Sequence, residues 1–387
     1  MHANKTKYFI FLTVFLAEFS FFFALPLLGK TPALSASSVS ACLAGAVILE
    51  SLLMLTSTGY LERFSRRTLI CASLLLRSAA FMTVFLTLSL PAWLFFFFLI
   101  AVSKSISKPF LREVLAETLS GPELKKALYT FSLCQNSAVF VAPMLAVAAM
   151  RFLFIETVLL TLVLLGVAMA VAAVPLIYAF PSNKASAGSP LAGMRAAFRG
   201  VMASTSIQRI LLSSFFCFLI MGVFITATML LDKINPDMGT YSGLFFSVVG
   251  VTICLWQGVV AKLTFLSDRY SSQIIMIGGT LSSAYLLGSV SVAIAALVAY
   301  SIYESVIIPE LYFKATLIPS GIPASVLFSY ILIVSNAGEA FGSWITGFAI
   351  THMADHIPLF IFITVFCSAM ISSLCLITAY RKEVPSL

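Results

Sequence analysis

Apolar segments of roughly 20 residues, the length that crosses the hydrocarbon core of a bilayer, follow one another along almost the entire chain. Of the 387 residues, 60% are hydrophobic and only 10% are charged. A soluble domain carries about 25% charged residues, and a soluble chain of this size could not cover its core with so few charges. The composition therefore predicts a polytopic membrane protein and excludes a cytosolic enzyme, a secreted disulfide scaffold and a nucleic-acid-binding domain.

The polar and Pro/Gly-rich breaks between these segments predict an all-α membrane protein with twelve transmembrane helices. Twelve spans with short turns need about 240–290 residues, so they fit within the chain. The expected spans are residues 8–28, 38–58, 68–89, 92–114, 127–149, 153–180, 209–231, 239–260, 273–290, 292–314, 325–350 and 358–379.

The positions of Lys and Arg predict how the chain is oriented in the membrane. With the N-terminus in the cytoplasm, 17 of the 23 basic residues fall in cytoplasmic segments, 3 fall outside and 3 fall within spans. Because basic loops stay on the cytoplasmic side, we expect a multi-pass protein of the plasma (inner) membrane with both termini in the cytoplasm. The same bias accounts for the net charge of +8, so we expect no nucleic-acid partner.

The longest polar stretch, residues 181–208, divides six spans from six. The predicted domains are an N-terminal six-helix bundle at 1–180, a cytoplasmic linker at 181–208 and a C-terminal six-helix bundle at 209–387. The halves repeat each other, because a shift of 200 residues brings Pro109 onto Pro309 and Asn136 onto Asn336. This order of matches predicts two pseudo-symmetric bundles.

A short charged turn after the second span strengthens the repeat. It reads Glu62-Arg63-Phe64-Ser65-Arg66-Arg67, and at a shift of 206 it meets Asp268-Arg269-Tyr270-Ser271. Two six-helix halves with such a turn resemble the major facilitator superfamily, whose pattern here is Gly-x-Leu-Ala-Asp-Arg-x-Gly-Arg-Lys/Arg. The resemblance covers the whole chain. It implies a conformational loop, made of Glu62, Arg63 and Arg66 with a second copy at Asp268 and Arg269, that locks the inner ends of the helices. The alternative is a basic loop that serves orientation alone.

Helix five resembles that of the superfamily's drug/proton antiporters, which carry Gly-x3-Gly-Pro-x2-Gly-Gly there. This chain has Ala138-x3-Ala142-Pro143-x2-Ala146-Val147, and helix eleven has the related Gly338-x3-Gly342. Small residues allow helices to approach closely, and Ala substitutes for Gly in this respect only in part. The acidic residue halfway along helix one, Glu18, is also similar to that of several proton-coupled drug exporters.

Charged residues within the spans are the first candidates for function, because a charge in mid-membrane costs about 2.5–3.5 kcal/mol. Glu50 and Arg77 lie at about the same depth on consecutive helices, and we expect them to form a structural ion pair.

Helix four carries an unusual basic stripe. Lys104, Lys108 and Arg112 are spaced at i, i+4 and i+8, so they lie along one helix face. In the superfamily fold this helix lines the central cavity, where such a stripe would attract anionic groups. The alternative is that Lys104 neutralises Glu18 across the bundle, and both roles can apply at different stages of a cycle.

Three acids at mid-depth, Glu18, Glu304 and Glu339, are the candidates for proton coupling. The second half has no basic residue at the depth of Glu304 and Glu339. A buried carboxyl group without a basic partner can take up and release a proton near neutral pH. The alternative is that these side chains simply face water in the cavity.

The sequence as a whole predicts a secondary active transporter that works by alternating access. We expect proton-coupled efflux of a small organic molecule, either a drug or a carboxylate-bearing metabolite such as a siderophore. A proton-coupled uptake symporter and a non-transporting membrane sensor or scaffold are the alternatives. The substrate-cavity candidates are Lys104, Lys108, Gln135, Asn136, Trp256, Gln257 and Asn336.

The sequence contains no nucleotide-binding motif, no Ser/His/Asp constellation in a polar segment and no metal-ligand spacing among its Cys residues. The pair His352-x3-His356 has a spacing that can bind zinc on a helix, but two ligands are too few for a site. We therefore expect no enzymatic activity, no cofactor and no metal. The expected partners are the substrate, the proton and the lipid bilayer, and the protein is expected to act as a monomer.

Overall fold

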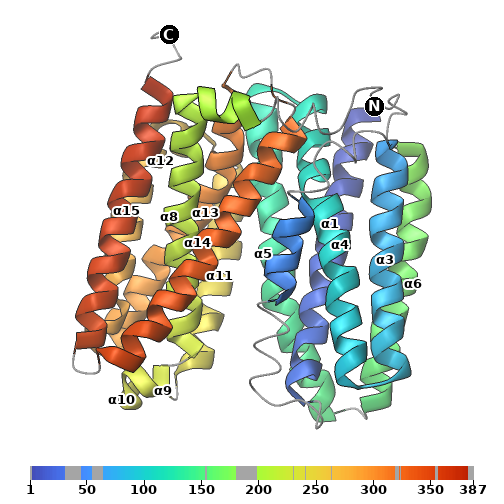
Figure 1. Cartoon of the computed structure of the whole chain (residues 1–387), viewed down its shortest axis with the longest axis horizontal. Coiled ribbons are helices and arrows are strands. Elements are labelled where there is room, and N and C mark those ends of the chain that lie inside the picture. The colour runs from blue at the N-terminus through green and yellow to red at the C-terminus, as the bar shows by residue number, and fades with distance from the viewer. Residues whose placement is uncertain are drawn as a thin grey trace. The chain divides into compact units, whose positions relative to one another are not determined.

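A computed structural model of the chain is almost entirely helical (Figure 1). It describes residues 2–30, 45–54, 64–152, 155–179, 198–229, 231–239, 241–262, 264–318, 322, 324–353 and 356–381. No strand occurs within these ranges, and each of the twelve expected spans coincides at least in part with a helix. The predicted all-α fold class is confirmed.

Within the described residues, the first half of the chain has six helical segments. They are α1 (His2–Lys30), residues 45–54, α3 (Arg66–Leu86), α4 (Leu90–Thr118), α5 (Gly121–Phe152) and α6 (Ile155–Ala179). Within the described residues, the second half begins with helical residues 198–203 and continues with six long helices and three short ones. They are α8 (Thr205–Met229), α9 (Leu231–Ile234), α10 (Pro236–Gly239), α11 (Ser242–Lys262), α12 (Thr264–Ser282), the 3-10 helix η2 (Ser283–Leu286), α13 (Val290–Thr316), α14 (Ala324–His352) and α15 (Ile357–Arg381).

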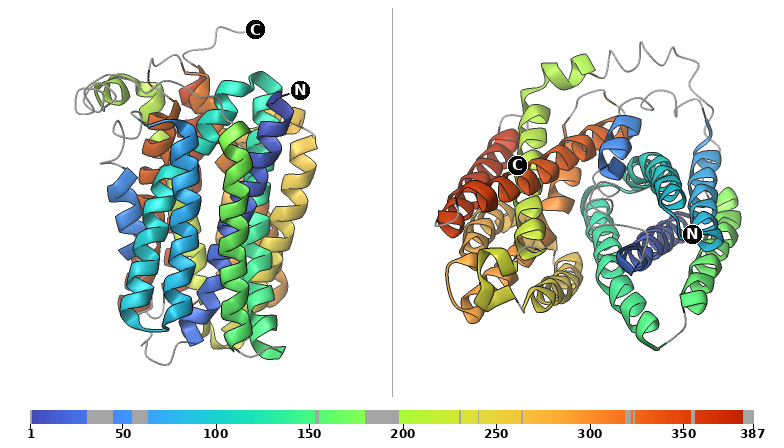
Figure 2. Two further views of the ribbon diagram at one scale, coloured as in Figure 1. Left: turned by 90° about the vertical axis from the view of Figure 1, so that its right-hand side faces the viewer. Right: turned by 60° about the horizontal axis from the view of Figure 1, so that its bottom comes forward.

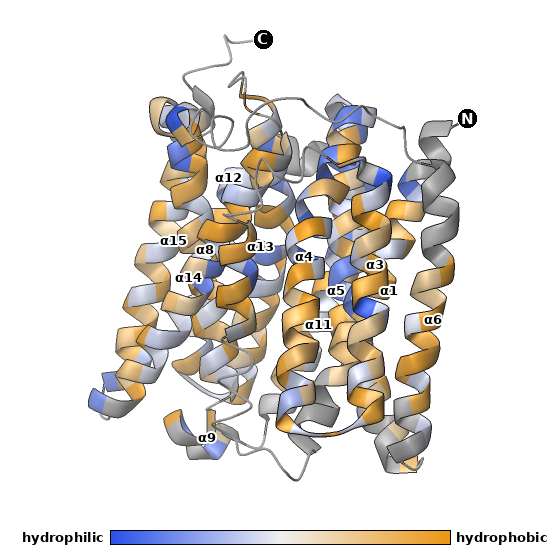
Figure 3. Ribbon diagram, turned by 45° about the vertical axis from the view of Figure 1, so that its right-hand side comes forward, coloured by the Kyte–Doolittle hydropathy of each residue, from blue (hydrophilic) through white to orange (hydrophobic). Residues whose placement is uncertain are grey.

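The helices have the composition of membrane spans. Within the described ranges, seven are long and apolar enough to cross a bilayer, and shorter apolar helices occur at 45–54, 160–171 and 244–260. Hydrophobic residues cover most of each helix, whereas hydrophilic ones gather at the ends and in short patches part-way along (Figure 3).

Helix α12 begins at Thr264, nine residues before the expected span. Asp268 and Arg269 therefore lie within this helix and not in a loop, which corrects the expected position of the second charged turn. No Gly or Pro interrupts residues 264–273, so the helix continues through this polar segment. In the first copy, Glu62 and Arg63 lie outside the described residues, and Arg66 is the first residue of α3. The locking role of both copies remains a prediction.

Contacts group the chain into two compact units. One comprises residues 1–119 and 134–197, and the other comprises residues 120–133 and 198–387. The first turns of α5 thus belong with the second unit, while the rest of this helix belongs with the first. Residues 181–197 of the expected linker lie outside the described ranges.

The two units repeat the same internal packing. In the first, α3 packs against α4 and α6, and α1 also packs against α4 and α6 (Figures 1 and 2). In the second, α12 packs against α13 and α15, and α8 also packs against α13 and α15. Since α8, α12, α13 and α15 are the sequence equivalents of α1, α3, α4 and α6, the pseudo-symmetry expected from the repeat is present in the fold.

Helices α8 and α14 of the second unit approach each other closely. Gly338 and Gly342 of α14 face the backbone of α8, where an added Cβ atom would overlap the carbonyl groups of Phe215 and Leu219. Gly222 of α8 faces α14 in the same way. Without side chains between them the two backbones touch, as small residues allow in transmembrane helix pairs.

Candidate functional site

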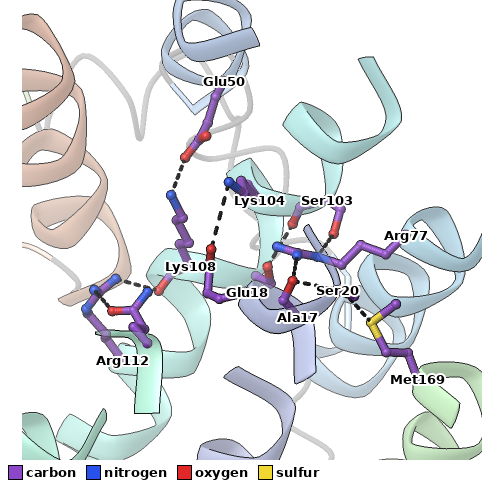
Figure 4. Close-up of polar contacts among 12 residues, drawn as sticks. Ala17, Glu18, Ser20, Glu50, Arg77, Ser103, Lys104, Lys108, Arg112 and Met169 are labelled. Carbon is purple, nitrogen blue, oxygen red and sulfur yellow. Dashed lines mark hydrogen bonds and ion pairs between the residues drawn. The ribbon is translucent and has the colours of Figure 1, made fainter. Parts of the chain in front are cut away.

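A cluster of charged side chains lies inside the first unit, on helices that are otherwise apolar (Figure 4). Its members come from α1, residues 45–54, α3 and α4, and all are largely buried. They are Glu18, Glu50, Arg77, Lys104, Lys108 and Arg112. Four are basic and two are acidic, so the cluster has more positive than negative charge within the membrane-spanning part of the protein.

Glu50 pairs with Lys108, whose Nζ lies 2.9 Å from a carboxylate oxygen of Glu50. The expected pair between Glu50 and Arg77 is therefore wrong. The Arg77 guanidinium instead donates to Ser103 Oγ at 2.9 Å and to the carbonyl oxygen of Ala17. Counting residues along the helices gave similar depths for Glu50 and Arg77. It could not show toward which neighbouring helix each of the two side chains points.

Arg77 is a positioning residue for helix α1. Its guanidinium lies between α3, α4 and α1, because Ser103 is on α4 and Ala17 is on α1. The hydroxyl group of Ser20 also donates to the carbonyl oxygen of Ala17, at 3.0 Å. These bonds fix the turn of α1 that carries Glu18, the next residue after Ala17.

Lys104 faces Glu18, but at a greater distance. Its Nζ lies 3.9 Å from Glu18 Oε2 and 3.6 Å from the centre of the Phe21 ring. This arrangement supports the expected neutralisation of Glu18 by Lys104 across the bundle. It also leaves room for the other expected role, attraction of an anionic group, because the ammonium is not bound tightly to the carboxylate.

Gln135 of α5 joins the cluster through Arg112. The guanidinium of Arg112 donates to Gln135 Oε1 at 3.0 Å and to the carbonyl oxygen of Lys108 at 3.4 Å. Three of the expected cavity residues, Lys104, Lys108 and Gln135, are thus brought together in the first unit. Asn136, the next residue on α5, is half-buried.

The second unit holds a different polar site, around Glu304 of α13. Tyr300 lies one helical turn before the buried Glu304, and its ring packs on that of Phe224 of α8, with the ring centres 4.5 Å apart. Glu339 of α14, which is half-buried, acts on Glu304 electrostatically. None of the ion pairs between described residues includes Glu304. Two acids from neighbouring helices therefore share this region.

A third cluster was not recognised in the sequence. Glu310 of α13 is completely buried and pairs with Lys125 of α5 at 2.5 Å and with Lys314 at 3.8 Å. Tyr129 also donates to Glu310, at 3.2 Å. The sequence placed Lys125 in an inner loop, whereas α5 begins at Gly121 and carries Lys125 into the second unit. A prediction that started this helix earlier would have placed Lys125 on it and could have indicated the pair.

The remaining expected cavity residues lie in the second unit. Trp256 of α11 packs against Tyr129 and Val260, Gln257 is completely buried, and Asn336 of α14 is half-buried. Within the described part of the chain, no group of three or more His, Cys, Asp or Glu side chains is placed to hold a metal ion.

No protein-family model matches the sequence, and no curated protein is similar to it. The structure, in contrast, is similar to solved transporters. The human organic anion transporter MFSD10 (TETRAN) has a TM-score of 0.78 at 15% identity, covering 97% of this chain and 99% of that one. The major facilitator superfamily transporter FucP in its outward conformation, also described as the E. coli fucose:proton symporter, has a TM-score of 0.75 at 12% identity, with 96% and 99% covered.

A bacterial homologue of the iron transporter ferroportin, in its outward-facing state, has a TM-score of 0.73 at 15% identity, with 97% of this chain and 100% of that chain covered. The match extends over nearly the whole length in all three comparisons. Together with the repeated packing of four equivalent helices in each unit, it confirms the resemblance read from the sequence: the chain has the fold of the major facilitator superfamily transporters.

Proposed function

We propose that this chain is a proton-coupled secondary transporter of a small organic anion, which works by alternating access of its two six-helix halves. The fold supports transport, but the similar structures are those of an organic anion transporter, a fucose:proton symporter and an iron transporter homologue. The fold therefore does not select the substrate. The observation that carries the proposal is the buried cluster of four basic and two acidic residues in the first unit.

The excess of basic residues favours a substrate that carries a carboxylate. Charges interact strongly where water is scarce, so an anion that enters the cluster offsets the repulsion among its basic groups. Lys108 is the more accessible of the two lysines, with 20% of its side chain exposed against 10% for Lys104. The same charges disfavour lipophilic cations. A carboxylate-bearing metabolite, of which a siderophore is one example, fits these requirements.

The acids of the second unit supply the proton-binding group. Glu304 is buried beside Tyr300, and Glu339 faces it from the neighbouring helix. Two ionised carboxyl groups repel each other in such surroundings, so binding one proton relieves the repulsion. We assign proton coupling to Glu304 in the first place, since Glu18 lies beside Lys104 and has a basic neighbour.

For the direction of transport, we propose that substrate leaves the cell across the plasma (inner) membrane in exchange for protons. This follows the resemblance of helix one to that of proton-coupled drug exporters and of helix five to that of drug/proton antiporters. A proton symporter is the second candidate, and Lys104 favours it. An anion that binds to Lys104 and a proton that binds to Glu18 add opposite charges to the same cluster, so each assists the binding of the other. Sensor or scaffold activity without transport would leave the proton site without a role.

Transport measurements on the purified protein in liposomes test this proposal. Uptake of cationic, neutral and anionic compounds should be measured with no pH gradient and with gradients of both signs. We expect the anions to be selected, their flux to depend on the gradient, and Lys104→Ala to abolish the selection. Exchange requires that proton and substrate fluxes run in opposite directions, and symport requires the same direction. Flux of cations that Lys104→Ala leaves unchanged would contradict the proposed substrate class.

A further inference from the structure

The two ion pairs of the charge cluster are unequal. Lys108 hydrogen-bonds Glu50 at 2.9 Å, whereas Lys104 lies 3.9 Å from the nearest oxygen of Glu18, too far for a hydrogen bond. Lys104 donates no hydrogen bond to any residue that the structure describes, although only 10% of its side chain is exposed. An ammonium group carries three N–H donors, so this one has capacity for a further acceptor.

An aromatic side chain nevertheless holds the ammonium of Lys104 in position. It lies 3.6 Å from the centre of the Phe21 ring, within the range of a cation–π contact. Phe21 is itself fixed, because it stacks on Phe96 and packs edge-on against Phe97, both at 6.4 Å between ring centres. Lys104 is therefore oriented without the help of a tightly bound carboxylate.

Glu18 can separate from Lys104 without losing all its favourable neighbours. Basic groups of α3 and α4 act on it electrostatically in addition to Lys104, and Glu50 acts on Lys104. The charged groups that face Glu18 are Lys104, Lys108, Arg77 and Arg112, and those that face Lys104 are Glu18, Lys108, Glu50 and Arg77. The carboxylate therefore stays within a positive environment when Lys104 turns to another anion.

We propose that Glu18 is the internal competitor of the substrate: a carboxylate of the substrate replaces Glu18 as the counter-ion of Lys104. This inference rests on the proposed transport of an organic anion, in the form of the proton symporter given above as the second candidate, and names the group that receives the anion. The site that it assigns is made of Lys104, Phe21 and the adjacent Lys108, and it takes a substrate with at least one carboxylate beside an apolar or aromatic part.

The exchange is accompanied by a proton. Once the substrate carboxylate lies on Lys104, Glu18 has lost its nearest counter-ion, and the two neighbouring carboxylates repel each other. A proton from water then adds to one carboxylate oxygen of Glu18, where an O–H bond forms and no other covalent bond changes. One carboxylate and one proton are thus bound together, and the net charge of the cluster is restored. Substrate binding should therefore take up a proton and not release one.

Titration calorimetry on the full-length protein in detergent tests this step. The probes are benzoate, succinate and citrate, with benzamide as the neutral counterpart, each measured in buffers of different ionisation enthalpy. We expect at least one of the three anions to bind with uptake of about one proton, while benzamide does not bind. Glu18→Gln, which removes the competing charge, should tighten anion binding by roughly tenfold and abolish the proton uptake.

Matched controls separate the site from the general effect of a substitution. Glu123→Gln and Lys126→Gln change exposed residues of α5 and should leave both measurements unchanged. Lys104→Gln should abolish binding. If this variant fails to fold, the double variant Glu18→Gln/Lys104→Gln replaces the loose pair by two neutral side chains and should fold but bind no anion.

Three outcomes would overturn the inference. They are absence of binding by all three anions, binding with proton release, and binding that Glu18→Gln leaves unchanged in affinity and in proton uptake. The liposome assay keeps this result separate from the proposed function. Anion flux that depends on a pH gradient, with no effect of Glu18→Gln on binding, would retain the transporter and remove only the competition between Glu18 and substrate.

Discussion

Helices α4 and α13 occupy equivalent places in the two units, yet they carry opposite charges at the same position. Lys104 and Glu304 are 200 residues apart, as are the prolines inside the two helices, Pro109 and Pro309. The proline is retained in both copies. The buried charge has changed sign, and with it the surroundings: Lys104 lies beside a carboxylate and a phenyl ring, whereas Glu304 lies beside a tyrosine and a second acid.

This difference separates what the two copies share from what they do not. The proline inside the helix agrees between the halves, while the buried charge at mid-depth differs in sign. Under the proposed function, the basic residue serves the anion and the acidic residue serves proton coupling. Four predictions test or refine this comparison, beginning with the largest expected effect.

The buried ion pairs of the two units should differ in their contribution to stability. Glu310→Gln leaves Lys125 buried without its counter-ion, and breaking such a pair costs about 3–5 kcal/mol. Glu50→Gln removes a hydrogen bond between charged groups, from a lysine that is 20% exposed, and we expect a loss of about 1.5–3 kcal/mol. Thermal unfolding of the purified variants in detergent measures both. The double variant Lys125→Met/Glu310→Leu should regain most of the loss, and equal effects of Glu310→Gln and Glu50→Gln would contradict the expected difference.

Equivalent small residues on α5 and α14 should not be interchangeable. Ala142 and Gly342 are 200 residues apart, and a Cβ at Gly342 would overlap the backbone of α8. Gly342→Ala should therefore destabilise by about 1–3 kcal/mol, as overpacking does. Ala142→Gly should cost about 1–2 kcal/mol through backbone entropy and loss of the buried methyl group of Ala142. Thermal unfolding compares the two, with Gly45→Ala as a control where the added Cβ meets no atom within 4 Å. A smaller loss of stability for Gly342→Ala than for Ala142→Gly would mean that α8 can move away from the added Cβ at little cost in free energy.

Glu304→Gln should separate proton coupling from substrate binding. The variant cannot lose or gain the proton, so flux driven by a pH gradient should fall at least tenfold, which corresponds to about 1.4 kcal/mol. Exchange of labelled for unlabelled substrate across liposomes, which needs no net proton movement, should persist. Loss of both activities would instead place Glu304 in the structure of the carrier and not in its coupling.

Phe21→Leu should weaken binding of an anion only moderately. The ring orients Lys104, and a partly buried cation–π contact contributes about 0.5–1 kcal/mol, or a two- to fivefold change in affinity. The calorimetric titration with carboxylate probes measures it. Phe95→Leu, an exposed position on the same helix as Lys104, is the control and should have no effect. An unchanged affinity in Phe21→Leu would show that Lys104 is oriented by its charged neighbours alone.

Hydropathy, basic-residue bias and the 200-residue repeat were sufficient to predict the helices, the fold class and the equivalence of the halves. They depend on the average properties of segments about 20 residues long, which sequence gives directly. Helix ends in polar segments were less predictable: α5 and α12 both begin six to nine residues earlier than expected, because polar residues outside the hydrocarbon core can still be helical.

The partners of buried charges were the least predictable part. Counting along a helix gives depth, but a contact also requires the direction in which each side chain points, and this depends on tertiary packing. Glu50 thus pairs with Lys108 and not with Arg77, and the pair of Lys125 and Glu310 was not foreseen. The relation of Lys104 to Glu18 was predicted as one of two alternatives, because only opposite charges at similar depth were available to argue from.

The glycines of α14 have a practical consequence for measuring motion in this protein. Where Gly338 and Gly342 touch the backbone of α8, neither helix can rotate or slide without first moving apart, so the pair should move as one rigid rod. A spin label on each of these two helices would then report a constant separation throughout turnover. That separation provides an internal ruler, against which displacements elsewhere in the chain can be calibrated.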